Sequence, residues 1–73
     1  MGLFFVHYIH STMNVVQTLT KQLDDRVATW RFVEVDGQYC AIGGNYKLVS
    51  YRSEAAMKRS IAWFNSKGFT AAA

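Results

Sequence analysis

The pattern of apolar and polar positions predicts a helix over residues 12–25. Ser11 or Thr12 precedes this segment as a candidate N-cap, whose side chain accepts a hydrogen bond from an amide of the first turn. Apolar side chains then recur at three- and four-residue intervals, which places them along one side of a helix. These apolar positions are Val15, Val16, Leu19 and Leu23. We therefore expect the segment to pack one apolar stripe against a sheet.

A second helix is predicted over residues 53–67. Ser53 is its candidate N-cap, Glu54 suits the positive end of the helix dipole, and Gly68 is a natural stop. The apolar stripe at i, i+4 and i+7 consists of Met57, Ile61 and Phe64. The tail that follows Gly68 has no strong structural signal.

Residues 27–51, between the two predicted helices, predict a three-stranded antiparallel sheet. Asp36-Gly37 separates two runs of β-prone residues, and glycine readily takes the positive φ that a two-residue hairpin turn requires. A turn at this point pairs Val33 with Cys40 and so fixes which side chains of the two strands share a face.

The second turn leaves two registers open for the third strand. Gly43-Gly44 is the turn signal, and if these glycines form the turn alone, Leu48 shares a face with Phe32. If Asn45 joins the turn, the third strand is turned over, because side chains alternate between faces with a period of two. The pattern alone does not choose between the two registers.

The first twelve residues contain an apolar and aromatic run from Leu3 to Ile9. The run has neither the preceding basic residue nor the small-residue cleavage pattern of a signal peptide, and it is too short to span a bilayer. Residues 1–12 are predicted to be an N-terminal strand or an arm that packs on a partner. The alternative is an extension upstream of a translation start at Met13. The candidate protein contacts in this segment are Phe4, Phe5 and Tyr8.

These elements predict a single α+β domain over residues 1–73. Its order is (β)-α-β-β-β-α, with an antiparallel three- or four-stranded sheet packed on two helices. No linker rich in Pro or in Gly and Ser divides the chain. At 73 residues the chain is near the lower limit for a domain that folds alone, a limit that dimerisation would relieve.

The predicted order of elements resembles that of double-stranded RNA-binding domains. Its three strands followed by a helix are also similar to the sheet-reading domains of plant transcription factors and of integrase arms. Both likenesses are of topology. The basic cluster expected at the start of the second helix of an RNA-binding domain is replaced here by "RSEAAM", with Glu54 and small residues before Lys58. We therefore assign no family from the sequence.

Composition and residue spacing argue against catalytic and metal chemistry. The lone Cys40 excludes an internal disulfide and, without a signal peptide, indicates a reducing cytoplasm. His7 and His10 would point to opposite faces of a strand, and Asp24-Asp25 is typical of a solvated turn. We predict a non-enzymatic protein with no catalytic residue, metal or other cofactor, no small-molecule substrate and no membrane partner.

Protein interaction is the function that we rank first. Aromatic residues make up 15% of the chain, more than a small core needs, and large rings often anchor interfaces. Tyr51 and Trp63 therefore join the N-terminal aromatic residues as candidate protein contacts. The chain is similar in length to small phage and prophage proteins that regulate larger assemblies. The sequence predicts an interaction or regulatory module whose partner is an unidentified protein or a second copy in a homodimer.

Nucleic-acid binding is the alternative. Eight Lys and Arg against five Asp and Glu give a net charge of +3, and the pI is near 9.3. From residue 45 to 67 the one acidic residue is Glu54. The candidate phosphate contacts are Arg31, Lys47, Arg52, Lys58, Arg59 and Lys67. This function ranks second because a net charge of +3 is modest for a domain that holds a polyanion at physiological salt.

Overall fold

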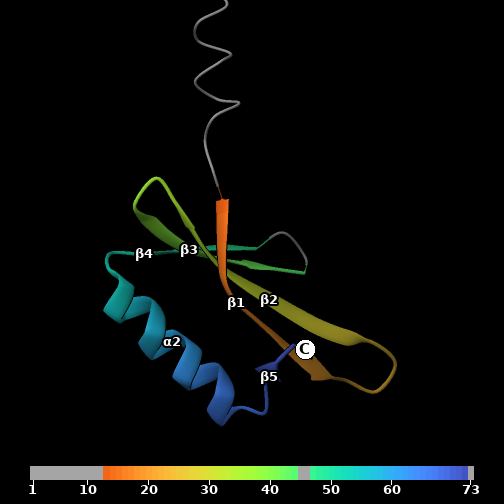
Figure 1. Ribbon diagram of the computed structural model, residues 1–73. Helices are drawn as coiled ribbons and strands as arrows, with labels where there is room; N and C mark the ends of the chain where they lie inside the picture. Colours follow the sequence, from red (N-terminus) through yellow and green to blue (C-terminus); the bar gives the residue numbers. More distant parts are fainter. Residues whose placement is uncertain (1–12, 45–46, 73) are drawn as a thin grey trace, which may run out of the picture.

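The computed structural model describes residues 13–44 and 47–72, which form a five-stranded antiparallel sheet with one helix against it (Figure 1). The elements are β1 Met13–Gln22, β2 Val27–Val35, β3 Gln38–Gly43, β4 Leu48–Tyr51, α2 Glu54–Ser66 and β5 Thr70–Ala71. The strand order is β4-β3-β2-β1-β5. The prediction of two helices on a three- or four-stranded sheet is therefore wrong. The predicted strand or arm at residues 1–12 lies outside the described residues.

The helix predicted over residues 12–25 is a strand, β1, which pairs with β2 along its whole length. The segment is rich in β-branched residues, which favour extended structure. A β-bulge between Val15 and Gln17 inserts Val16, so the alternation of faces shifts by one position there. Val15 then lies on one face and Leu19 on the other, and the apolar spacing imitates a helical period. Because this segment is a strand, the chain does not have the α-β-β-β-α order, and the topological likeness to double-stranded RNA-binding domains no longer holds.

The hairpin between β2 and β3 has the predicted register, with Val33 opposite Cys40. Its turn residues Asp36 and Gly37 have φ values of 52° and 80°, which are the positive values that a tight hairpin turn needs. The third strand follows the register expected for the longer of the two turns, because Leu48 lies opposite Ile42. Leu48 consequently points away from the face that carries Phe32.

The hydrophobic core lies between α2 and the sheet. Its fully buried cluster consists of Leu19, Phe32, Ala41 and Met57. Phe64 of the helix packs against aromatic residues of the sheet and the tail. Its ring centroid lies 5.6 Å from that of Phe32 and 5.1 Å from that of Phe69. The predicted second helix is confirmed, with Ser53 as the N-cap that accepts a hydrogen bond from the Ala56 amide.

The tail after Gly68 is ordered, although its sequence has no strong signal. Phe69 packs edge-on against Phe64, and Thr70–Ala71 pairs with β1 as the edge strand β5. Lys21 of β1 contacts the segment that follows α2. Its Nζ donates a hydrogen bond to the Lys67 carbonyl at 2.8 Å and lies 5.9 Å from the Phe69 ring centroid. The tail therefore adds both a strand and a core residue.

Glu34 links β1, β2 and the hairpin turn at the opposite end of the sheet. The Asn14 side-chain amide donates a hydrogen bond to one carboxylate oxygen at 2.9 Å, and the Gly37 backbone amide donates one to the other at 2.8 Å. Both bonds favour the charged carboxylate, so they hold the pKa of Glu34 below its ordinary value of 4.5.

We expect the stability that Glu34 contributes to be present above its ordinary pKa and to be lost as the pH falls through the lower folded-state pKa. Urea midpoints measured at a series of pH values below about 4.5 test this, with Asn14→Ala and Glu34→Gln as variants. The urea midpoints of both variants should depend less on pH than that of the wild type in this pH range. The other carboxylates are common to all three proteins, so an identical pH dependence would contradict the role of Glu34.

Candidate functional site

The sheet face that points away from α2 has no cover among the described residues (Figure 1). Strand register places both apolar and polar side chains on this surface, which we call the open face: Met13, Val15, Thr18, Thr20, Gln22, Val27, Thr29, Arg31, Val33, Val35, Gln38, Cys40, Ile42, Leu48 and Ser50. These residues come from four neighbouring strands, β1 to β4. The open face is therefore continuous across most of the sheet.

The open face has an apolar centre. Val33 is fully buried between its cross-strand neighbours Val15 and Cys40, yet it is not part of the core cluster under α2. Around it, the exposed fractions are 55% for Met13, 53% for Val15 and 66% for Leu48. Arg31 is the one charged side chain that β1 to β4 place on this face. The apolar centre suits contact with another apolar surface, whereas Thr18, Thr20 and Thr29 make the part of the face beyond Arg31 polar.

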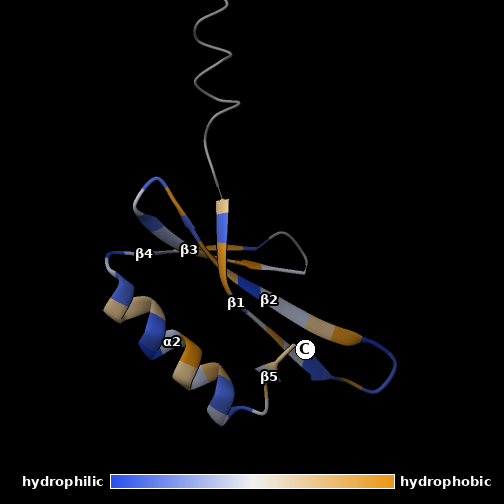
Figure 2. Ribbon diagram, viewed as in Figure 1, coloured by the Kyte–Doolittle hydropathy of each residue, from blue (hydrophilic) through white to orange (hydrophobic). Residues whose placement is uncertain are grey.

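Polar and apolar residues alternate along α2 (Figure 2), and a second surface lies along one flank of this helix. Arg59, Trp63 and Lys67 follow each other at four-residue intervals, so they form a row on the same side of the helix. Trp63 is 56% exposed, and the Lys67 Nζ lies 5.5 Å from its ring centroid. The row therefore presents one large ring between two cations.

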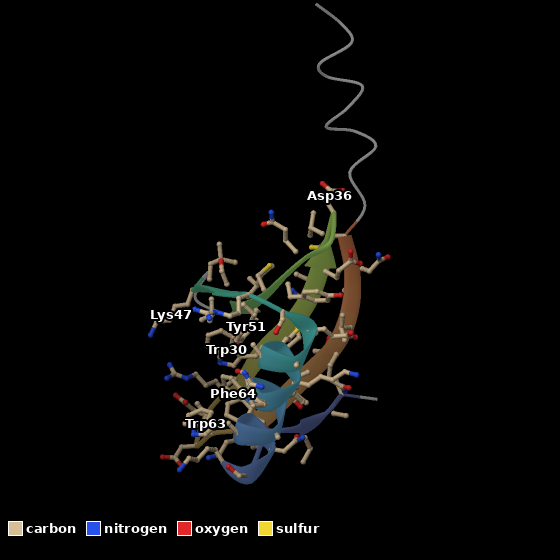
Figure 3. The ribbon with its side chains drawn as sticks, turned by 90° about the vertical axis from the view of Figure 1, so that its left-hand side faces the viewer. Trp30, Asp36, Lys47, Tyr51, Trp63 and Phe64 are labelled. Carbon is tan, nitrogen blue, oxygen red and sulfur yellow. The ribbon has the colours of Figure 1, made fainter. Side chains whose placement is uncertain are left out.

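A shallow hollow of about 280 Å³ lies beside Trp30, between the residues that join β1 to β2 and the ends of β3 and β4 at Gly44 and Lys47. Arg26, Trp30, Gly44 and Lys47 are among the residues that line it. Figure 3 shows Lys47, Trp30 and Trp63 along the same side of the molecule. Ring contacts connect the two tryptophans, because Phe64 lies 5.2 Å from Trp30 and 5.1 Å from Trp63. We call the row and the hollow together the basic aromatic flank; its members are Arg26, Trp30, Lys47, Arg59, Trp63 and Lys67.

The structure separates the candidate phosphate contacts into groups. Lys47, Arg59 and Lys67 belong to the basic aromatic flank, whereas Arg31 is on the open face. Lys58 lies on the other flank of α2, where its Nζ is 3.8 Å from a carboxylate oxygen of Glu54. Arg52 is in the short link between β4 and α2. The six cations therefore do not form one strip.

The candidate protein contacts also have different surroundings. Tyr51 lies on the helix side of the sheet, and its hydroxyl is 2.7 Å from the Ser60 hydroxyl, so it joins β4 to α2. Trp63 is on the basic aromatic flank. Phe4, Phe5 and Tyr8 lie outside the described residues. The open face was not singled out from the sequence, although period-two alternation through Arg31, Val33 and Val35 is a signal for it.

Metal-binding clusters and membrane-spanning helices were sought among the described residues. In residues 13–44 and 47–72, no three His, Cys, Asp or Glu side chains gather in a way that could hold a metal ion. Within the same ranges, no helix has the length and apolar character needed to cross a membrane. Comparisons of the chain with protein-family models, with curated proteins and with solved structures found no match.

Proposed function

We propose that the chain is a small, non-enzymatic protein-interaction domain that forms a homodimer through its open face. The observation that carries this proposal is the apolar centre, where Met13, Val15 and Leu48 are more than half exposed around the buried Val33. Covering these side chains removes apolar area from water, which contributes a favourable free energy of about 25 cal/mol per Å² of buried area. A partner that packs on this face would therefore gain affinity from its centre.

Because the core is small, we expect a second copy of the chain to cover the open face. The fully buried side chains among the described residues are Leu19, Phe32, Val33, Ala41 and Met57. A domain of this size buries a small fraction of its surface, and association of two copies supplies the missing cover. A sandwich of two sheets packed about 10 Å apart is a common way to do this.

The dimensions and charge of the open face also suit a symmetric dimer. Strands spaced by about 4.8 Å and rising about 3.3 Å per residue give the face a footprint of roughly 500 Å² in projection. A stable interface buries ~800 Å² of accessible surface per partner, so most of the open face would have to take part in the contact. A two-fold axis that passes near Val33 and runs across β2 would place the two Arg31 side chains on opposite sides of the axis and about 13 Å apart, because each lies two residues from Val33 at about 3.3 Å per residue.

Light scattering coupled to size-exclusion chromatography tests the homodimer. We expect wild-type protein to elute with the mass of two chains and Leu48→Lys to elute with the mass of one. Leu48 is 66% exposed, so its replacement should leave the monomer folded but should place a desolvated charge in the interface. Val49→Lys is the matched control, because Val49 is the next residue of β4 and points to the opposite face.

Cys40 provides a second readout on the unaltered chain. Its thiol is half-buried on the open face, so its reaction with a maleimide should slow as the protein concentration rises and the dimer forms. A cytoplasmic location suits this proposal, because a free thiol on an interface stays reduced there. A wild-type monomer at every concentration, or Val49→Lys dissociating as readily as Leu48→Lys, would overturn the homodimer.

A further inference from the structure

Trp63 is exposed in a way that the core does not explain. Its ring meets Phe64 at 90° and 5.1 Å, while 56% of the residue faces solvent. The other tryptophan in the chain, Trp30, is instead packed between Phe64 and the backbone of Gly43. An exposed indole next to cations is the arrangement on which unpaired bases stack in proteins that bind single-stranded nucleic acid.

The charges around Trp63 favour an anionic ligand. Among the described residues, the one ion pair joins Lys58 to Glu54 on the far flank of α2, so Lys47, Arg59 and Lys67 have no carboxylate partner there. Asp24 and Asp25 are in the same turn as Arg26 and offset its charge locally. The phosphate contacts are therefore best assigned to Lys47, Arg59 and Lys67.

We propose that the basic aromatic flank binds a single strand of nucleic acid. In this arrangement a base stacks on the Trp63 indole, Arg59 and Lys67 contact the phosphates on either side of it, and the strand continues past Trp30 toward Lys47. A single strand is favoured over a duplex because base pairs in a duplex keep their faces stacked on each other and offer none to Trp63. This surface is distinct from the open face, so the proposal does not depend on the homodimer.

Fluorescence anisotropy of a labelled oligothymidylate of about 20 nucleotides, at about 50 mM salt, tests the proposal with the full chain. Trp63→Ala should weaken binding about tenfold or more, because stacking on an aromatic ring contributes strongly for each base. Arg59→Ala should also weaken binding and reduce the slope of log affinity against log salt by about 0.7. Lys58→Ala is the matched control, since it removes the same charge from the neighbouring residue on the other flank and should change neither value.

Each variant is first compared with the wild type by circular dichroism melting, so that loss of binding is not confused with unfolding. The exposed positions of Arg59 and Trp63 lead us to expect unchanged melting. Absence of wild-type binding would overturn the proposal, as would equal losses for Lys58→Ala and Arg59→Ala or unchanged binding by Trp63→Ala. Competition by duplex DNA as strong as that by the single strand would overturn the stacking assignment. Retention of binding by Leu48→Lys would show that the flank acts independently of the open face.

Discussion

Phe32→Ala is expected to lower the free energy of unfolding by about 3–5 kcal/mol. Phe32 is fully buried in β2, and its ring centroid lies 5.6 Å from that of Phe64 and 6.4 Å from that of Tyr51. Truncation removes contacts with both the helix and β4, and the cavity it leaves lies among the core side chains between α2 and the sheet. A domain with a total stability of about 5 kcal/mol would retain about 0–2 kcal/mol, so up to about half of the molecules would be unfolded at equilibrium.

Urea denaturation followed by circular dichroism measures this loss. Leu48→Ala is the control, because Leu48 is 66% exposed and its truncation should change the monomer's stability by less than about 0.5 kcal/mol. The comparison is made at a protein concentration low enough for the monomer, since the open face contributes to stability once a dimer forms. A loss below about 1 kcal/mol for Phe32→Ala would show that the core is not organised around this ring.

Local turn and cap signals in the sequence predicted the β2–β3 hairpin and α2. Asp36-Gly37 sets the β2–β3 register because a tight turn between two β-prone runs leaves one pairing. Ser53 begins α2 because its side chain satisfies a free amide of the first turn. Each of these signals involves residues that are close together in the chain, so no knowledge of the tertiary structure was needed.

The strands β1 and β5 depend on contacts that a local pattern does not contain. The bulge at Val16 exists only in relation to β2, and by shifting the alternation it made β1 look helical. The pairing of Thr70–Ala71 with β1 joins residues about fifty positions apart, and alanine gives no strand signal. Long-range pairing of this kind overrides local propensity.

The candidate surfaces were predicted only in part, for the same reason. Arg59, Trp63 and Lys67 could be placed on one side of a helix from their spacing alone. Their connection to Lys47 passes through Phe64 and Trp30, which lie far apart in the chain and meet only in the folded core. The open face became visible once the third-strand register placed Leu48 beside Ile42 rather than beneath α2.

Gly43→Ala is expected to destabilise the protein by about 1–3 kcal/mol, the usual cost of overpacking. Gly43 is opposite Trp30 across the β2–β3 ladder, and a Cβ added at Gly43 would lie 3.1 Å from two carbons of the Trp30 ring. The ring has little room to withdraw, since Phe64 packs against it at 5.2 Å. Glycine is therefore required at this position for space, and Trp30 holds its place because Gly43 has no side chain.

Gly44→Ala is the matched control, because a Cβ there would meet its nearest neighbour, the Thr29 carbonyl oxygen, at an ordinary 3.8 Å. Both variants restrict the unfolded chain equally, so the difference between their urea midpoints isolates the contact with Trp30. In a Trp30→Leu background the difference should shrink, since the smaller side chain leaves space for the new methyl group. Equal midpoints for the two alanine variants in the wild-type background would show that Trp30 can move away from β3. In that case the hollow beside Lys47 would not be a fixed feature of the basic aromatic flank.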